Sequence, residues 1–115
     1  MIIEMLNSKI HRATVNMSNI NYEGSISISE ELMQAAKIII NQKVLVVDVN
    51  NGNRFETYVI KSDYINYICI NGAAARLVNI GDKVIIMSFV FMNLDEASNH
   101  EPKIVLLDNE NKIKS

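Results

Sequence analysis

The segment from Lys43 to Lys61 reads KVLVVDVNNGNRFETYVIK and contains the clearest structural signal in the chain. Lys43 to Asn50 is rich in β-branched residues, which favour a strand, and Arg54 to Lys61 reads as the returning strand. Between them, Asn51-Gly52 suits the positive φ angles of a type I′ turn, the turn that joins antiparallel strands most tightly. The segment therefore predicts a β-hairpin.

Strand patterns continue on both sides of this hairpin. Lys9 to Val15 alternates, which places its odd-numbered residues on one face and its even-numbered residues on the other. Ser25 to Ser29 alternates as well, and Tyr67 to Ile70 and Lys103 to Leu107 read as shorter strands. Lys83 to Phe91 is a long apolar strand that we expect to be covered on both faces.

One helix is expected among these strands. Ser29 is a capping residue followed by Glu30 and Glu31, and acidic residues favour the first turn of a helix. The apolar residues from Leu32 to Ile39 then recur at helical spacing. Many short strands, tight turns and one helix predict a small closed β-barrel, because closure removes exposed strand edges.

The composition favours one globular, cytoplasmic domain spanning residues 1–115. The chain has 115 residues, 49% of them hydrophobic, which fits a single domain with one core. A net charge of −2 and scattered basic residues argue against a nucleic acid partner. Cys69 is the only cysteine, so no intrachain disulfide can form and a reducing compartment is expected. No apolar run approaches the roughly 18 residues of a membrane span, so no membrane partner is expected.

Conventional catalytic and metal-binding motifs are missing from the sequence. There is no G-x-S-x-G elbow, no glycine-rich phosphate loop and no Cys/His zinc spacing. His11 and His100 lie far apart, with no acidic cluster beside either. We therefore expect no metal site.

The stretch Tyr22-Glu23-Gly24-Ser25 lies between two predicted strands and offers a different chemistry. Taken alone, Gly-Ser is a common turn dipeptide, and that is the plain structural interpretation. A serine hydroxyl can also attack the carbonyl of the preceding residue and convert the peptide bond into an ester. Glycine leaves that carbonyl uncrowded and tolerates backbone conformations that cost other residues about 1–3 kcal/mol. Elimination to dehydroalanine and hydrolysis would then release ammonia and leave a pyruvoyl group at the new N-terminus.

A pyruvoyl ketone is an electron sink that would accept the electron pair released by decarboxylation. For a substrate with two carboxylates, Arg54 suits bidentate recognition of one, and Lys9 supplies a second positive charge. Tyr58 can donate the proton that the product needs. Thr57 and Asn71 are candidates to polarise the attacked carbonyl, as in an oxyanion hole. Because neighbouring strand residues point to opposite faces, Thr57 and Tyr58 can reach one site only if the strand twists or bulges.

Together these motifs resemble the bacterial aspartate 1-decarboxylase family. They occur in the family's order over nearly the whole chain, and several correctly spaced motifs are more specific than any one of them. The matching pieces are Ser8-Lys9-Ile10-His11-Arg12-Ala13, Tyr22-Glu23-Gly24-Ser25, Asn51-Gly52, Arg54, Thr57-Tyr58, Asn71-Gly72-Ala73-Ala74-Ala75-Arg76 and Gly81-Asp82-Lys83-Val84-Ile85-Ile86.

The resemblance implies a mainly β fold, namely a small six-stranded double-psi β-barrel with one or two short helices. It also implies a homotetramer with active sites between subunits. The precursor would cleave itself between Gly24 and Ser25 into a beta chain of residues 1–24 and an alpha chain of residues 25–115 that begins with the pyruvoyl group. Its substrate would be L-aspartate, and its product would be the β-alanine used for pantothenate and coenzyme A.

By motif match, the resemblance assigns roles to individual residues. Ser25 becomes the covalent group that forms a Schiff base with the substrate, and Tyr58 becomes the proton donor. The substrate would be held by Lys9 and Arg54 through its carboxylates, and by Thr57 and the backbone of Gly72, Ala73 and Ala74. The residues implied near the cleavage site or the pocket are His11, Tyr22 and Asn71.

Two departures from the family leave alternatives open. Val47 stands where some members carry an aromatic residue, and the stretch from Ser62 to Tyr67 looks one residue shorter and lacks a glycine-bearing turn. These differences allow a pyruvoyl decarboxylase of another amino acid, such as glutamate. A further alternative is a non-enzymatic β-barrel that binds a partner or a small acid, in which Lys9 and Arg54 are solvated charges and His11 is structural.

Overall fold

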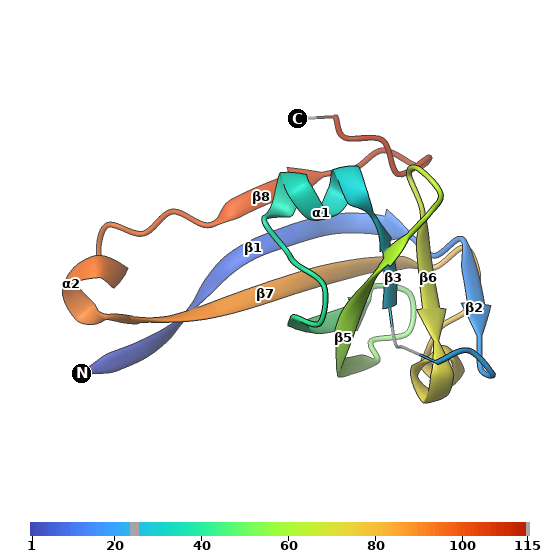
Figure 1. The fold of residues 1–115 in the computed structure, drawn as a ribbon, viewed down its shortest axis with the longest axis horizontal. Coiled ribbons are helices and arrows are strands. Elements are labelled where there is room, and N and C mark those ends of the chain that lie inside the picture. Colours follow the sequence, from blue (N-terminus) through green and yellow to red (C-terminus); the bar gives the residue numbers. More distant parts are fainter. Residues whose placement is uncertain (24–25, 115) are drawn as a thin grey trace.

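A computed structural model describes residues 1–23 and 26–114 as a mainly β structure, which confirms the predicted fold class (Figure 1). Its strands are β1 (Ile2–Thr14), β2 (Met17–Asn19), β3 (Ile26–Ser29), β4 (Lys43–Asp48), β5 (Arg54–Ser62), β6 (Ile68–Asn71), β7 (Lys83–Asn93) and β8 (Lys103–Leu106). Its helices are α1 (Glu30–Ala36), α2 (Leu94–Ala97) and the 3₁₀ helix η1 (Gly72–Leu77). Within these ranges, no helix is long and apolar enough to cross a membrane.

All strands belong to one hydrogen-bonded order, β2-β6-β3-β5-β4-β7-β1-β8. Three pairs are parallel (β1 with β8, β2 with β6, and β3 with β5), and the others are antiparallel. Among the described residues the ladder has two free ends, so its closure is not seen. Six strands were expected, but the described residues form eight. The two additional strands are the short β2 and β8, which pair onto the two ends of the order. The double-psi arrangement stays a prediction.

The predicted hairpin is confirmed as the antiparallel pair β4 and β5. Its turn differs from the expected type I′ turn, because Gly52, with a φ of +78°, is the only loop residue with a positive φ. Asp48 accounts for the difference. Its Oδ1 accepts hydrogen bonds from the backbone N–H groups of Asn50 (2.8 Å) and Asn51 (3.3 Å). These bonds stabilise a loop that is longer than a two-residue turn.

β1 is longer than predicted and contains a bulge. It begins at Ile2 rather than Lys9, and its pairing with β7 shifts register between Ile10 and Ala13. Arg12, inside that shift, has a φ of 63°. Because a bulge changes which face the following residues occupy, Ile10 and Ala13 are both fully buried, and the predicted strict alternation is wrong across this point.

α1 begins where predicted but ends at Ala36, before the predicted end at Ile39. The chain leaves the helix because Lys37 takes the left-handed conformation, with a φ of 56° and a ψ of 44°. Ser29 is the N-cap residue by position, yet its hydroxyl does not cap the helix. Instead its Oγ accepts the N–H of Tyr67 at 3.1 Å, so this hydroxyl links the start of α1 to the residue directly before β6.

The core lies where the inner halves of β1 and β7 meet β3 to β6 and α1. Its largest fully buried side chains are Ile10, Ile26, Ile28, Leu32, Ile68, Ile70, Ile86, Val15, Val44, Val46, Val59 and Val84. The expectation that β7 is covered on both faces is wrong for its outer half. Phe91 is 69% exposed there, because the paired strand β1 satisfies the backbone of β7 but does not cover the faces of its side chains.

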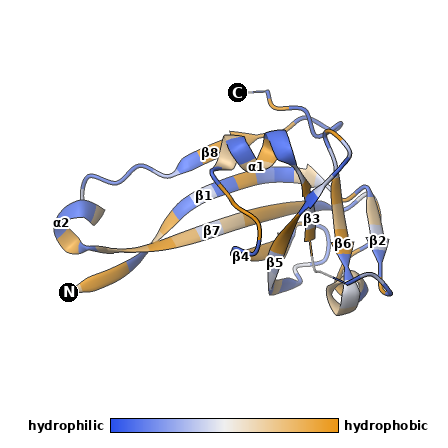
Figure 2. Ribbon diagram, viewed as in Figure 1, coloured by the Kyte–Doolittle hydropathy of each residue, from blue (hydrophilic) through white to orange (hydrophobic). Residues whose placement is uncertain are grey.

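The outer halves of β1 and β7 form an arm that extends away from the other strands and ends beside α2 (Figure 1). In this arm, Ile2 lies opposite Asn93 and Leu6 lies opposite Phe89. Figure 2 shows hydrophobic residues at the N-terminal end of β1 and along β7. Ile2 is 66% exposed and Leu94, in α2, is 54% exposed, so the arm carries apolar surface that this chain leaves uncovered.

Candidate functional site

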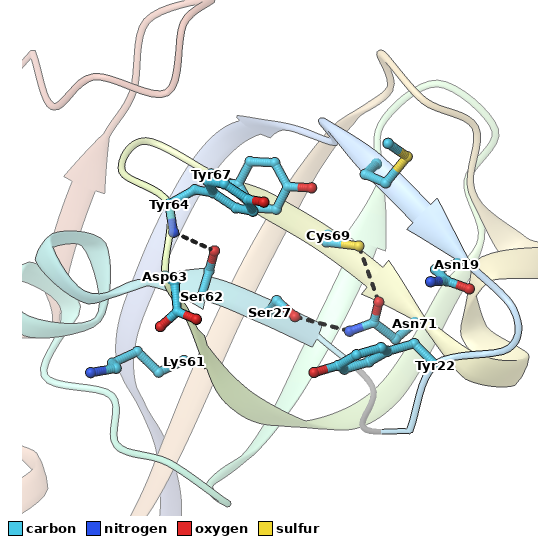
Figure 3. A pocket seen from close by; sticks show the side chains of 11 residues that line it. Asn19, Tyr22, Ser27, Lys61, Ser62, Asp63, Tyr64, Tyr67, Cys69 and Asn71 are labelled. Carbon is cyan, nitrogen blue, oxygen red and sulfur yellow. Dashed lines mark hydrogen bonds between the residues drawn. The ribbon is translucent and has the colours of Figure 1, made fainter.

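A pocket of about 450 Å³ opens beside β6 and contains two of the predicted site residues, Tyr22 and Asn71 (Figure 3). Its walls come from β2, β3 and β6, from the end of β5, and from the segments that follow β2 and β5. The lining residues are Met17, Asn19, Tyr22, Ser27, Lys61, Ser62, Asp63, Tyr64, Tyr67, Cys69 and Asn71.

Asn71 is the most thoroughly fixed of the predicted residues. It ends β6, is 2% exposed and occupies the N-cap position of η1. Its amide Nδ2 donates to Ser27 Oγ at 2.9 Å, and its Oδ1 accepts from Cys69 Sγ at 3.0 Å. Figure 3 shows both hydrogen bonds within the pocket. The amide is therefore held between two strands, β3 and β6.

The predicted substrate-contacting backbone of Gly72, Ala73 and Ala74 begins η1, directly after Asn71. Gly72 has a φ of +63°, a conformation that favours glycine, and a Cβ at this position would lie 3.6 Å from the backbone oxygen of Tyr22. Tyr22 is thus brought against Gly72 at the edge of the pocket. Ala73 is exposed, whereas Ala74 is half-buried and packs against the core.

Thr57 and Tyr58 lie on β5 directly before Val59, which is opposite Ile26 in the parallel pairing of β3 with β5. Ile26 is the first described residue after the predicted cleavage site, so β5 carries both residues to that end of β3. Thr57 is 9% exposed and Tyr58 is 42% exposed. The pairing of β4 with β5 is regular through both positions, so they point to opposite faces, and no bulge of β5 turns them to one site.

The Thr57 hydroxyl is unusual because its Oγ1 is buried and has no hydrogen-bond partner among the described residues. A buried polar atom without a partner costs about 1–3 kcal/mol, so such atoms are rare in folded proteins. This hydroxyl is therefore free to bind a group from outside the described residues.

Lys9 and Arg54 are kept apart within the chain. Lys9 lies on β1, opposite Met87 of β7, and Arg54 lies on β5, opposite Val47 of β4. The strands β7 and β4 separate β1 from β5, so at about 4.8 Å per strand the two backbones are roughly 14 Å apart along the sheet. Neither side chain forms an ion pair within the described part of the chain.

His11 is half-buried on β1, and its Nδ1 has no hydrogen-bond partner among the described residues. Burial lowers the pKa of His11 below 6.5, and the nearby positive charges of Lys9, Arg12 and Lys114 lower it further. These effects therefore favour the neutral form of the imidazole. It does not line the pocket that contains Asn71.

The predicted cleavage residues Gly24 and Ser25 lie outside the described residues. The chain is described up to Glu23 and again from Ile26. Tyr22 and Ser27, which flank this pair in the sequence, both line the pocket.

Sequence reasoning missed several residues of this pocket. Ser27, Cys69 and Tyr67 lie on or beside short strands, and only the strand pairing brings them together. Burial raises the pKa of the Cys69 thiol and of the Tyr67 phenol, so both groups carry their protons at neutral pH. The alternation of the segment from Ser25 to Ser29 places Ser27 on the same face as Ser25, and this was the sequence signal that could have linked Ser27 to the site.

The shortened stretch from Ser62 to Tyr67 forms part of the pocket wall. Asn66 takes the positive φ, 50°, that a glycine would otherwise supply, and its N–H donates to Glu31 Oε1 at 2.5 Å. The rings of Tyr64 and Tyr67 pack with centroids 5.0 Å apart. Val47, the other departure noted in the sequence, is half-buried on β4 and does not line this pocket.

Fold and pocket thus define a mainly β domain with a site of hydroxyl, amide and thiol groups. Among the described residues, no cluster of side chains could hold a metal ion. The family model for aspartate decarboxylase matches residues 1–114. The chain therefore belongs to the aspartate decarboxylase family.

Individual relatives agree with this match. The chain is 60% identical to the aspartate 1-decarboxylase of Caldicellulosiruptor bescii over 114 residues, which cover 98% of this chain and 89% of that protein. It is 54% identical to the aspartate 1-decarboxylase of Clostridium botulinum, over 98% of this chain and 90% of that protein. Among solved structures it is similar to the designed protein msDPBB_sym2, with a TM-score of 0.47 and 20% identity over 75% of this chain and 99% of that chain.

Proposed function

We propose that this chain is a carboxy-lyase that converts L-aspartate to β-alanine and carbon dioxide, the reaction that supplies β-alanine for pantothenate and coenzyme A. The family match over residues 1–114 and the relatives named aspartate 1-decarboxylase support this reaction. The single Cys69, without a disulfide partner, is in line with a cytoplasmic location.

The reactive group proposed for this reaction is a pyruvoyl group made from Ser25. In the first step the Ser25 Oγ bonds to the Gly24 carbonyl carbon, and the bond from that carbon to the Ser25 nitrogen breaks. Elimination then releases Gly24 as a carboxylate, and water replaces the nitrogen, which leaves as ammonia. The products are residues 1–24 and a chain of residues 25–115 that begins with the ketone.

The position of Thr57 is the observation that carries this proposal. Thr57 has a buried Oγ1 with no partner among the described residues, and it lies two residues before Val59. Val59 pairs with Ile26, next to the proposed cleavage site. A hydroxyl there can donate to the oxygen of the attacked carbonyl, whose negative charge grows as the serine adds. The Asn71 amide, held at the pocket beside β3, can supply an N–H as a second donor.

The Thr57 hydroxyl and the Asn71 amide are neutral hydrogen-bond donors, which suit the oxygen of a small ketone. When present, a pyruvoyl group accepts the electron pair that decarboxylation releases. Tyr58, adjacent to Thr57 and 42% exposed, is the proposed donor of the proton that replaces carbon dioxide. Lys9 and Arg54 would bind the substrate carboxylates, and the N–H groups at the start of η1 would donate further hydrogen bonds to the same carboxylates.

The proposed active form is a homotetramer with sites between subunits. The separation of Lys9 from Arg54 supports this, because one chain alone spreads its carboxylate-binding groups over two distant strands. The opposite orientations of Thr57 and Tyr58 support it as well. The exposed apolar arm, with Ile2 and Phe91, offers surface that a second subunit can cover.

Product formation by the wild-type chain and by Ser25→Ala tests this function. After full maturation, the wild type should release β-alanine from aspartate and turn over glutamate far more slowly. The Ser25→Ala variant should release none. Equal turnover of the two amino acids would overturn the substrate assignment, and equal activity of the two chains would overturn the role of Ser25.

A further inference from the structure

Asn71 is held in one orientation by two side chains from different strands. Cys69, two residues earlier on β6, donates its thiol hydrogen to Asn71 Oδ1 at 3.0 Å. Ser27 of β3 accepts a hydrogen bond from Asn71 Nδ2 at 2.9 Å. All three side chains are at most 9% exposed, so water competes little for these bonds.

This use of Asn71 differs from the usual use of asparagine at its position. An asparagine at an N-cap normally accepts an N–H of the first helical turn, but Asn71 makes no side-chain cap to η1. Its amide has two N–H donors, and one of them goes to Ser27. The other has no partner among the described residues and is therefore available for a further hydrogen bond.

The thiol of Cys69 is suited to this donor role. Burial raises its pKa, so Cys69 stays protonated at neutral pH and presents a hydrogen to Asn71 Oδ1. In the structure the thiol donates to Oδ1 and the Ser27 hydroxyl accepts from Nδ2, so both ends of the Asn71 amide have a hydrogen-bond partner.

Residues on both sides of the proposed cleavage bond line the same pocket as the Asn71 amide. Tyr22, two residues before Gly24, and Ser27, two residues after Ser25, both line the pocket with Asn71 (Figure 3). We propose that Cys69 and Ser27 are positioning residues, which orient the Asn71 amide so that its free N–H donates to the Gly24 carbonyl oxygen during self-cleavage. This inference rests on the proposed function, and neither residue forms or breaks a covalent bond in it.

Self-cleavage rates of full-length variants test the inference. Intact mass gives the fraction cleaved against time for the wild type, Cys69→Ala, Cys69→Ser and Ser27→Ala. The two alanine variants should cleave roughly three- to tenfold more slowly, the effect of one lost hydrogen bond on a rate. The Cys69→Ser variant keeps a donor and should stay within about twofold of the wild type.

Ser29→Ala is the matched control on the same strand. Ser29 is buried and its hydroxyl accepts the N–H of Tyr67, but it forms no hydrogen bond with the Asn71 side chain. This variant should lose thermal stability and still cleave at the wild-type rate. A role for Cys69 in packing alone would make the serine variant as slow as the alanine variant, and that result would overturn the inference.

A second readout does not depend on activity. In a Ser25→Ala background, which cannot cleave, hydrogen exchange of the Asn71 side-chain amide is measured by NMR. Exchange should be faster with Cys69→Ala or Ser27→Ala added, and unchanged with Cys69→Ser. Unchanged exchange in the alanine variants would overturn the inference even if the wild type cleaves. A wild type that never cleaves would instead refute the proposed function. Faster exchange of the Asn71 amide in the alanine variants would then still show that Cys69 and Ser27 fix its orientation.

Discussion

Lys9 of β1 and Arg54 of β5 are separated by two intervening strands, β7 and β4. Lys9 is paired with Met87 of β7, and Met87 is paired with Leu45 of β4. Leu45 is in turn paired with Glu56 of β5, two residues beyond Arg54, so the two cations are also offset along the strands. A four-carbon substrate that uses both cations is therefore more easily held between two chains than within one.

Lys9→Ala and Arg54→Ala chains should complement each other when they are assembled together. Each variant alone should lose most aspartate turnover, because one substrate carboxylate lacks its cation. In mixed assemblies, roughly a quarter of sites between subunits would combine an intact Lys9 with an intact Arg54 and regain activity. Co-expression followed by a β-alanine assay measures this. Mixed assemblies that are no more active than the separate variants would place both cations in a site within one chain.

Thr57→Val should uncouple stability from self-cleavage. The substitution removes a buried hydroxyl that has no partner among the described residues, so the melting temperature should stay the same or rise. Cleavage should slow by roughly 10²–10³-fold if the hydroxyl stabilises the attacked carbonyl. Thermal melting and a mass time course check both parts. Cleavage at the wild-type rate would exclude this role for Thr57.

Tyr58→Phe should slow the turnover of aspartate and leave self-cleavage nearly unchanged. Its hydroxyl is proposed to act on the substrate, so the variant should mature at a rate close to that of the wild type. Turnover of aspartate by the matured protein should fall by roughly 10²–10⁴-fold, the usual contribution of a general acid. The assay must use fully cleaved protein, confirmed by mass. Full turnover without the phenol would require a different proton donor.

Asp48→Asn should stabilise the protein at neutral and alkaline pH. Asp48 is fully buried, and burial, followed by the neighbouring Asp82, raises its pKa above the ordinary 3.8. The folded chain therefore binds this proton more tightly than the unfolded chain. The stability that the proton contributes is complete below pH 3.8 and is lost as the pH rises through the raised folded pKa. Asparagine keeps the Oδ1 acceptor for Asn50 and Asn51 and carries no charge.

Melting temperatures of both chains across a pH series check this prediction. The advantage of Asp48→Asn should grow by several degrees from acidic to alkaline pH. Asp108→Asn is a control of opposite sign, because backbone hydrogen bonds from Lys112 and Glu110 lower the pKa of Asp108. That variant should lose stability above the ordinary pKa of 3.8 and converge with the wild type as the pH falls. An advantage of Asp48→Asn that does not change with pH would contradict the assignment of a raised pKa to Asp48.

The sequence predicted the fold well wherever local pattern determines structure. The hairpin of β4 and β5 and the start of α1 at Glu30 follow from residue type and spacing. The prediction failed where strand pairing, or a hydrogen bond from a side chain to the backbone, decides the outcome. The bulge at Arg12 reverses the expected faces of β1, and Asp48 reshapes the hairpin loop through its side chain.

The candidate site shows the same division. Motifs identified Tyr22 and Asn71, and the structure brings both to one pocket. Ser27 and Cys69 carry no motif, because their importance comes only from the pairing of β3 with β6. The placement of Lys9 far from Arg54 was equally invisible, since it depends on the order of strands in the sheet.

Self-cleavage is the central claim, and the intact mass of the purified chain before and after incubation at growth temperature tests it most directly. We expect the 13.0 kDa chain to give two fragments that meet between Gly24 and Ser25. The larger fragment should be lighter than a serine-started chain by the mass of one ammonia, which marks the ketone. A single 13.0 kDa species that persists through the incubation would contradict the claim.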